Sequence, residues 1–306
     1  MRKFSLLLVL LVLLTAAGTA HAAYPNRPIT IICPFAAGGG TDAVARILAT
    51  LLQEELGVPV NIVNRTGDDG VIGHRAILSS RADGYTIGLG SVDLAMFSWM
   101  GLAPFTASNF TPIAGINLDM AAITVPAGTW DNYAALMADV RASRGQYTAS
   151  GTTAGGIWHL AMASWLVAEG LPANHVRWIP SAGAAPAQKE MMAGGVNMVT
   201  CSLAEVSELA GAGKAKVLAY MGEERSPKFP DVPTMKELGV FAPNVGAWRG
   251  IVGPNGMPQE AVRKLEETLA KIIASREFIE FMEGRGFGIR FLPSKEWGEF
   301  MIDAEK

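Results

Sequence analysis

Residues 33–52 read CPFAAGGGTDAVARILATLL, and the order of residue types in this stretch decides the fold that we predict. The stretch begins at the end of an isoleucine-rich run that closes at Pro34, which is typical of a buried parallel strand. Three glycines follow. Apolar residues then recur at steps of three and four from Val44 to Leu56, which is one face of a helix, and Gly57 ends it. We therefore predict a strand, a glycine loop and a helix.

Strand and helix patterns alternate along the rest of the chain, which predicts an α/β protein with mainly parallel sheets. The first series continues with a strand at 60–63, a helix at 73–78 and a strand at 86–89. The second series has strands at 147–150, 176–179, 196–200 and 217–220. Its helices are expected at 157–167, in a segment that ends at 192, and at 204–210. The C-terminal residues contain predicted helices at 258–275, 278–283 and 297–304 but no predicted strand, so they must pack on one of these series. We place them on the first series, with crossings near 115–125 and 220–230.

Two α/β series joined by two crossings predict a two-lobed protein. We expect lobe 1 to comprise residues 23–120 and 226–306, and lobe 2 to comprise residues 121–225. Hinges are expected near Leu118–Ile123 and Leu218–Gly222. Ligands of such sheets bind beyond the carboxyl ends of the strands, so the cleft between the lobes is the expected site.

The first glycine loop suits a negatively charged ligand. Glycine lets a ligand approach the backbone closely, and the helix that begins at Thr41 or Asp42 leaves its first amides without internal partners. Those donors and the helix dipole favour an anion. The sequence lacks the lysine of a phosphate-binding P-loop and the third glycine of a dinucleotide fingerprint. A tight turn without a ligand remains the alternative for this loop taken alone.

A second loop, SGTTAGGIWHLA at 150–161, repeats the design of strand end, hydroxyls, glycines and helix start. Its hydroxyl groups can donate to oxygen atoms without introducing a cation. Two such loops facing each other across a cleft predict a small organic acid with more than one carboxylate.

Six segments occur together in one order, namely YPNRPITIICPFAAGGGTDAVAR, RADGYTIGLGS, SGTTAGGIWHLA, AGAAPA, ERSPKFPDVPTMKELG and WRGIVGPNGMP. On these segments the chain resembles the solute-binding proteins of tripartite tricarboxylate transporters, the Bug or TctC-type receptors. The resemblance runs through essentially the whole mature chain. The segments WRGIVGP and GIWHLA resemble the tricarboxylate-receptor branch in particular.

This resemblance implies a type II Venus-flytrap fold, capture of carboxylates in the periplasm and delivery to a membrane permease. It also implies that the two glycine loops grip a ligand carboxylate, and by position this role falls on Phe35, Ala36, Ala37, Gly38, Gly39, Ser150, Thr152 and Thr153. Thr41 and Asp42 match the helix start, and Ala182, Gly183 and Ala184 match a further cleft loop.

Three more residues are candidates because of their chemistry. Trp158 either forms an apolar wall of the cleft or packs in the core. His159, near a helix start, either lines the site or serves in capping and packing. Arg249 is the one charged residue of AWRGIVGP, and it either pairs with a ligand carboxylate or bridges to an acid of the other lobe.

Two positions depart from the resemblance. The segment NRTGDDG places Asp68 and Asp69 where the family often has small residues. Facing the cleft, they would repel a third carboxylate or favour a cationic group, but exposed loop acids are common and we expect them to point to solvent. Cys201-Ser202 replaces an acid found in many relatives, which argues against a ligand held there by an ammonium group.

The N-terminal residues predict export. Arg2 and Lys3 precede a 14-residue apolar stretch, and Ala20-His21-Ala22 has the small residues that a signal peptidase needs. We expect a signal peptide at 1–22, cleavage near Ala22 and a monomer in the periplasm. Without those residues the chain has 23 basic and 28 acidic residues, so nothing indicates nucleic acid as a partner.

The chemistry-bearing residues do not form a catalytic pattern. Cys33 and Cys201 lie in apolar stretches and are expected to be buried thiols. The histidines lack metal-ligand spacing, and no G-x-S-x-G elbow is present, so we expect no metal, cofactor or catalytic residue. The sequence therefore predicts a binding protein for a di- or tricarboxylate. The alternatives are a receptor for a signalling partner and an exported enzyme acting on a carboxylated substrate.

Overall fold

The computed structural model describes residues 24–241 and 245–305, so the predicted signal peptide lies outside the described residues. The strands are β1 (Ile29–Cys33), β2 (Val60–Asn64), β3 (Thr86–Ser91), β4 (Phe110–Pro126), β5 (Thr148–Ser150), β6 (Arg177–Trp178), β7 (Met198–Ser202), β8 (Ala215–Tyr220), β9 (Gly246–Pro254) and β10 (Ile289–Pro293). The helices are α2 (Gly40–Leu56), α3 (Val71–Leu78), α4 (Tyr133–Ala142), α5 (Ile157–Ala168), α6 (Ala184–Met192), α7 (Leu203–Gly211), α8 (Gln259–Ile273), α9 (Arg276–Arg285) and α10 (Ser294–Asp303).

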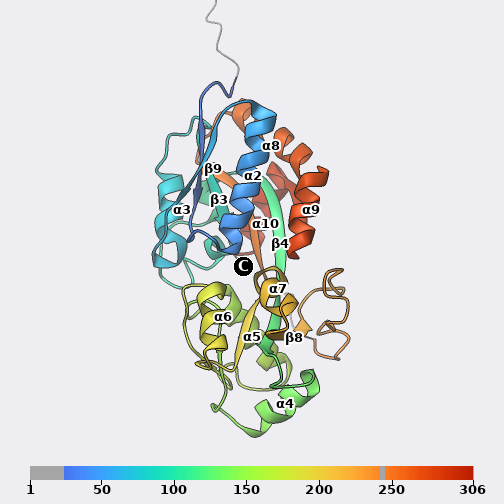
Figure 1. The fold of residues 1–306 in the computed structure, drawn as a ribbon. Helices are drawn as coiled ribbons and strands as arrows, with labels where there is room; N and C mark the ends of the chain where they lie inside the picture. Colours follow the sequence, from blue (N-terminus) through green and yellow to red (C-terminus); the bar gives the residue numbers. More distant parts are fainter. Residues whose placement is uncertain (1–23, 242–244, 306) are drawn as a thin grey trace, which may run out of the picture.

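The strands form two lobes that share β4. The strand order is β2-β1-β3-β9-β4-β7-β5-β6, with β8 and β10 also paired to β4. Residues 110–120 of β4 pair with β9, whereas residues 121–126 pair with β7 and β8. Figure 1 shows α2, α3, α8 and α9 around the upper lobe and α4 to α7 around the lower lobe, with β4 running between them.

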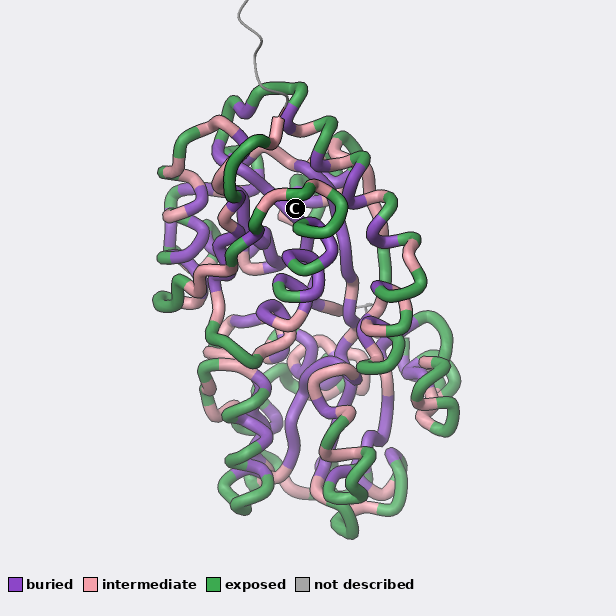
Figure 2. Tube along the Cα trace, turned by 45° about the horizontal axis from the view of Figure 1, so that its top comes forward, coloured by how far each residue is buried: buried purple, intermediate pink, exposed green. Residues whose placement is uncertain are grey.

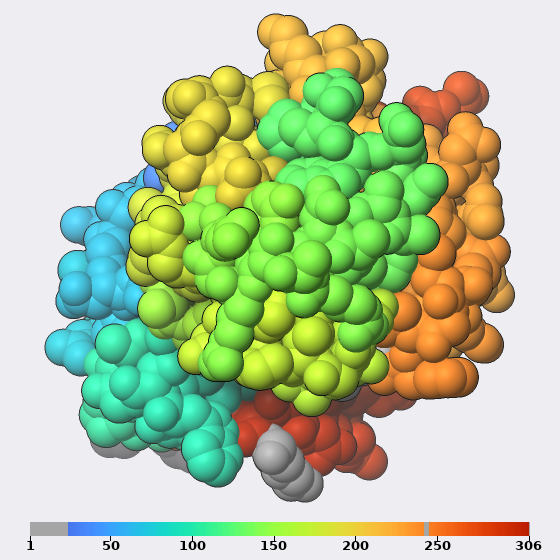
Figure 3. Space-filling view, turned by 90° about the horizontal axis from the view of Figure 1, so that it is seen from below, coloured from blue at the N-terminus to red at the C-terminus, as the bar shows by residue number. Residues whose placement is uncertain are grey.

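Buried segments lie within both halves of the molecule, as Figure 2 shows, and one apolar cluster continues from the lower lobe into the upper lobe, which has a second cluster between α2 and α8. In the upper lobe α2 packs on α8, and Leu48, Leu52 and Leu265 are fully buried. Burying a leucine side chain contributes about 1.5–3 kcal/mol. In the view of Figure 3, from below, the green and yellow residues of the lower lobe cover most of the surface. The predicted two-lobed α/β fold is confirmed.

The predicted helix after the first glycine loop is confirmed as well. It ends at Leu56 because Gly57 adopts the left-handed conformation (φ 68°) and its N–H donates to the carbonyl of Gln53. Only a residue without a Cβ adopts that conformation at little cost. This local signal therefore fixes the residue at which α2 ends.

The prediction that the C-terminal residues contain no strand is wrong. β9 lies between β3 and β4 in the sheet, and β10 pairs with β4. The glycines of β9 hid it, because glycine is uncommon in strands. Gly250 is required by packing: a Cβ there would lie 2.5 Å from the ring of Trp297 on α10.

Two further differences concern the middle of the chain. The predicted crossing at 115–125 is part of one 17-residue strand, β4, and helix α4 was not predicted. The sheets are also mixed, since β4 runs antiparallel to every strand that it pairs with. Among the described strands, parallel pairing joins β1 to β2 and β3, and β5 to β6 and β7, and an isolated parallel bridge joins Tyr220 to Thr234.

The second crossing falls later than residue 226. The N–H of Tyr220 donates to Pro233, and Met235 donates back to Tyr220, so this segment stays on β8 of the lower lobe. The chain reaches the upper lobe at β9, just after Val245, whose carbonyl accepts from Ala121. The lobe boundaries that we propose are therefore near residue 120 and residue 245.

Candidate functional site

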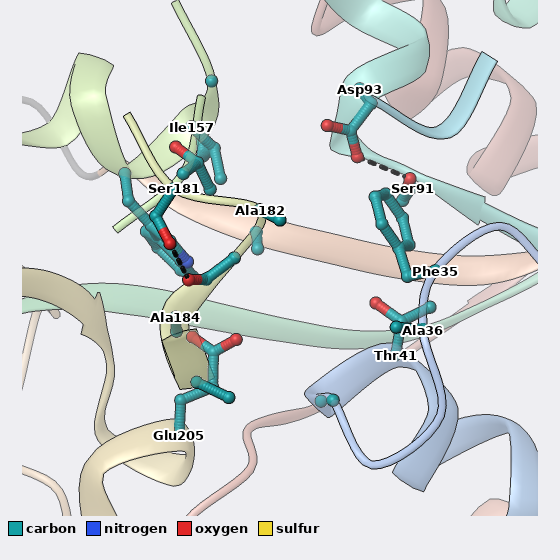
Figure 4. Close-up of a pocket in the computed structure, with 18 of the residues that line it drawn as sticks. Phe35, Ala36, Thr41, Ser91, Asp93, Ile157, Ser181, Ala182, Ala184 and Glu205 are labelled. Atoms are coloured by element: carbon teal, nitrogen blue, oxygen red, sulfur yellow. Dashed lines mark hydrogen bonds between the residues drawn. The ribbon is translucent and has the colours of Figure 1, made fainter. Parts of the chain in front are cut away.

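A cavity of about 430 Å³ lies between the lobes. Loops that follow β1, β3, β5 and β6 line it, together with α7 and β9, and Figure 4 shows these segments converging. The predicted site residues that line it are Phe35, Ala36, Ala37, Gly38, Gly39, Thr41, Thr152, Thr153, Trp158, Ala182, Gly183, Ala184 and Arg249. The structure thus brings both glycine loops to one space.

The start of α2 presents free donors to this cavity. Its N-cap residue, Gly39, has an extended backbone (φ −80°, ψ 173°) and no side chain that could cap the helix. The amides of Gly40, Thr41 and Asp42 have no acceptor within the helix, because the first intrahelical bond is donated by Ala43 to Gly39. These donors lie at the positive end of a 17-residue helix, which favours an anion.

Asp42 does not line the cavity, although it was a predicted site residue. Its carboxylate is buried and accepts from the Gly38 amide (2.9 Å), from Arg46 (2.7 Å) and from Asn64 (2.8 Å). Burial acts to raise the pKa of Asp42, but these hydrogen bonds outweigh it and hold the pKa below its usual value. Asp42 therefore shapes the glycine loop while its charge is neutralised away from the cavity.

The lower lobe contributes two more helix starts. α5 begins after Gly156 and α6 begins after Gly183, and neither helix has a side-chain cap. Ile157 and Ala184, the first residues of these helices, line the cavity. Three helix N-termini from two lobes thus meet at one space, which concentrates positive potential there.

The hydroxyl of Thr152 lies at the same loop. Its Oγ1 is buried and has no hydrogen-bond partner among the described residues. A buried hydroxyl without a partner costs about 1–3 kcal/mol. Thr152 lines the cavity through its other atoms, whereas its hydroxyl packs against Gly156 and does not face the cavity.

Two predicted residues of the lower lobe lie outside the cavity lining. The Ser150 hydroxyl is buried and donates to the carbonyl of Ile179 (2.7 Å), so it ties β5 to the loop after β6. His159 accepts from the Gly155 amide through Nδ1 (2.9 Å), and its ring packs 4.8 Å from that of Trp178. Of the alternatives for His159, the structure shows packing, together with a hydrogen bond to the loop before α5 that does not cap the helix.

Arg249 lines the cavity but already has partners. Its Nη1 donates to Asp119 (2.6 Å) and to Asn117, and its Nε donates to Thr41 (2.9 Å). Asp119 lies in the part of β4 that pairs with β9, so the bridge stays within the upper lobe rather than crossing to the other one. The buried pair holds the guanidinium against the start of α2, where a Cβ on Gly40 would lie 3.2 Å from Nη2.

Several cavity residues were missed by the sequence analysis. They are Asp69, Ser91, Asp93, Ser181, Lys189 and Glu205. Ser91 is the last residue of β3 and Asp93 follows it, so the strand-end rule that located the other loops could have found them. The expectation that both acids of NRTGDDG point to solvent is wrong for Asp69, whereas Asp68 is exposed and does not line the cavity.

Two of the missed acids have altered acidity. Burial raises the pKa of Asp93 to about 6, while the hydrogen bond from Ser91 opposes the shift and the charge of Asp69 adds to it. Burial also raises the pKa of Glu205, and Arg249 acts against that shift. The Oε2 of Glu205 accepts from the amide and hydroxyl of Ser202 in a capping box at the start of α7.

The described part of the chain contains neither a membrane-spanning helix nor a metal cluster. Within residues 24–241 and 245–305, no helix is both long enough and apolar enough to cross a bilayer. Within these ranges no three histidine, cysteine or acidic side chains gather as a metal site. Cys33 and Cys201 are separate buried thiols.

Comparisons with known proteins agree with this geometry. Residues 44–306 match the family model described as tripartite tricarboxylate transporter family receptor. BugT of Bordetella pertussis is 31% identical over 276 residues, which cover 89% of this chain and 84% of BugT. A TctC solute-binding protein from Polaromonas is 34% identical with a TM-score of 0.71, covering 92% of this chain and 96% of that one. R. palustris Rpa4515, solved with adipate, is 25% identical with a TM-score of 0.85 and covers 92% and 95%.

Proposed function

The chain belongs to the receptor family of tripartite tricarboxylate transporters, and we propose that it captures a small di- or tricarboxylate in the cavity between its lobes and delivers it to a membrane permease. The family consists of periplasmic solute-binding proteins, not enzymes. The function that we propose for this chain is therefore binding and release of a ligand, without a chemical step.

The observation that carries the proposal is the meeting of three uncapped helix starts at one cavity. Each charge-assisted hydrogen bond from such a start contributes about 1.5–3 kcal/mol. Several of them exceed the cost of ordering a small ligand and reach about −8 kcal/mol, which corresponds to micromolar affinity. Helix starts on both lobes can hold carboxylates at the two ends of one molecule, which favours a ligand with more than one carboxylate group.

The same arrangement suggests how binding is reported. A ligand that bonds to α2 on one side and to α5 or α6 on the other favours the closed arrangement of the lobes. The two connections near Met120 and Val245 are the segments about which the lobes would turn. We propose that the permease recognises the closed form, and the family likeness supports this choice over a signalling partner.

A thermal-shift screen tests the proposal. The mature protein is unfolded and refolded first, so that any retained ligand is removed. It is then heated with monocarboxylates, dicarboxylates, tricarboxylates, aromatic acids and amino acids, and with sugars and diamines as controls. Binding raises the melting temperature by mass action, so we expect a rise with at least one carboxylate. A rise with sugars or diamines alone would contradict the proposal.

A further inference from the structure

Glu205 belongs to α7 of the lower lobe, but its carboxylate lies beside the start of α2 of the upper lobe. A Cβ added to Gly40, the first residue of α2, would lie 3.6 Å from Oε1 of Glu205 and 3.2 Å from Nη2 of Arg249. Figure 4 shows Glu205 and Thr41 on segments that come from the two different lobes. Because Gly40 has no side chain, the acid can approach the helix start at which we place a ligand carboxylate.

The carboxylate of Glu205 is held in this position by its own helix. Its Oε2 accepts from the amide and from the hydroxyl of Ser202, at 3.1 Å each, in the capping box that begins α7. These bonds use Oε2, and Oε1 is the oxygen that lies toward Gly40. The side chain is therefore fixed by bonds that do not depend on a ligand, and it cannot turn away from α2 without breaking the cap.

The negative charge of Glu205 is not neutralised by an ion pair within the part of the chain that the structure describes. Burial raises the pKa of Glu205 and Arg249 acts against that rise, but the guanidinium of Arg249 is paired with Asp119 (2.6 Å). Asp42 differs, because its charge is paired with Arg46 (2.7 Å) away from the cavity. Glu205 lines the cavity, so a bound ligand meets its charge.

Two carboxylates beside one helix start repel each other. At an effective dielectric constant near 20, repulsion between charges about 6–8 Å apart corresponds to roughly a ten- to hundredfold loss of affinity. The loss grows with every further negative charge that the ligand brings to this side of the cavity. Glu205 therefore disfavours ligands according to their charge, whereas the backbone donors of α2 accept any carboxylate.

We propose that Glu205 is a specificity-determining residue, which limits the negative charge that the cavity can hold beside the start of α2. A ligand with one carboxylate at that end is accepted, and a ligand with two carboxylates there is disfavoured by repulsion. This inference rests on the proposed function and adds to it the residue that ranks ligands by charge. Since Glu205 and Gly40 belong to different lobes, the discrimination acts when the lobes are close together around the ligand.

Calorimetric titration with two matched ligands tests the inference on the refolded mature protein. Propane-1,2,3-tricarboxylate is glutarate with a third carboxylate on its middle carbon, and at about pH 7.5 all carboxyl groups of both ligands are ionised. We expect the wild-type protein to bind glutarate at least about tenfold more tightly than the tricarboxylate. Glu205→Gln should bind both ligands more tightly, glutarate by about tenfold and the tricarboxylate by about a hundredfold.

Two controls separate the charge of Glu205 from its structural role. Glutamine has nearly the same shape and can keep the capping box, so the melting temperature of ligand-free Glu205→Gln should stay within a few degrees of the wild-type value. Glu208→Gln removes the same charge from the same helix, but Glu208 is exposed and does not line the cavity. This control should leave both affinities within about twofold of those of the wild type.

The outcomes distinguish the inference from the proposed function. Folded Glu205→Gln that binds neither ligand more tightly than the wild type overturns the inference, and the proposed function stands if any carboxylate of the thermal-shift screen binds the wild type. An equal gain for both ligands, or the same gain in Glu208→Gln, also overturns the inference, because the effect would not come from charge beside α2. Failure of every carboxylate in the screen to bind overturns the proposed function itself.

Discussion

Replacing Gly39 by aspartate places a fixed carboxylate at the start of α2. The backbone of Gly39 already has the extended conformation of an N-cap residue, and a Cβ there meets only the carbonyl oxygen of Ala36 at 3.6 Å. An aspartate side chain at the N-cap accepts from the amides of the first turn. It therefore occupies the donors that we assign to the ligand and adds a like charge beside them.

The expected loss follows from two terms. Blocking one charge-assisted hydrogen bond costs about 1.5–3 kcal/mol. Repulsion between two carboxylates about 5 Å apart adds roughly 3 kcal/mol at an effective dielectric constant near 20. Together they weaken binding by at least about a thousandfold. Gly39→Asn blocks the same amide without the charge, so its loss is expected to be only about 10- to 100-fold.

Calorimetric titration with the best-binding carboxylate measures both variants, and thermal unfolding measures their stability. Asparagine and aspartate are good N-cap residues, so the melting temperature of either variant should stay within a few degrees of the wild-type value. Wild-type affinity in folded Gly39→Asp would refute the reasoning. Equal losses in the two variants would refute the charge argument and leave only the blocked amide.

Three further predictions concern single groups. Thr152→Val removes a buried hydroxyl that has no partner within the described chain, so it should raise the free energy of unfolding by about 1–3 kcal/mol; a decrease in urea unfolding contradicts this prediction. Arg249→Met leaves the buried Asp119 without its ion-pair partner (2.6 Å), so it should lower the free energy of unfolding in urea by about 3–5 kcal/mol. A decrease of less than about 1 kcal/mol contradicts this prediction. Since the pKa of Asp93 is raised to about 6, the ligand-free protein loses stability as pH rises from about 4 to 6, and Asp93→Asn should be the more stable protein at pH 7.5; a lower melting temperature for this variant contradicts the shift.

The parts of the fold that the sequence predicts are those with local signals. The helix from Gly40 to Leu56 has apolar periodicity, a glycine loop before it and a left-handed glycine after it, and all three are properties of neighbouring residues. β9 lacks such signals because it contains glycines, and one of them, Gly250, is required by Trp297, which comes 47 positions later in the sequence. Contacts of that kind become visible only when the chain is folded.

The candidate site divides in the same way. The glycine loops were predicted because backbone donors at a helix start follow from residue type alone. Whether a side chain lines the cavity depends on its hydrogen-bond partners in the fold. Asp42 accepts from Arg46 and Ser150 donates to the carbonyl of Ile179, and neither lines the cavity. Asp69 lines the cavity and Asp68 does not, although both have a left-handed backbone (φ 53° and 46°), which is rare for residues other than glycine. No pattern in the segment NRTGDDG predicts which of its two acids lines the cavity.

A crystal structure of the mature protein with its best-binding carboxylate tests the central claim most directly. We expect carboxylate oxygens about 2.7–3.1 Å from the amides of Gly40 or Thr41 on the upper lobe and from the start of α5 or α6 on the lower lobe. A ligand bound outside this cavity, or one that leaves the helix starts of either lobe without contact, would contradict the account.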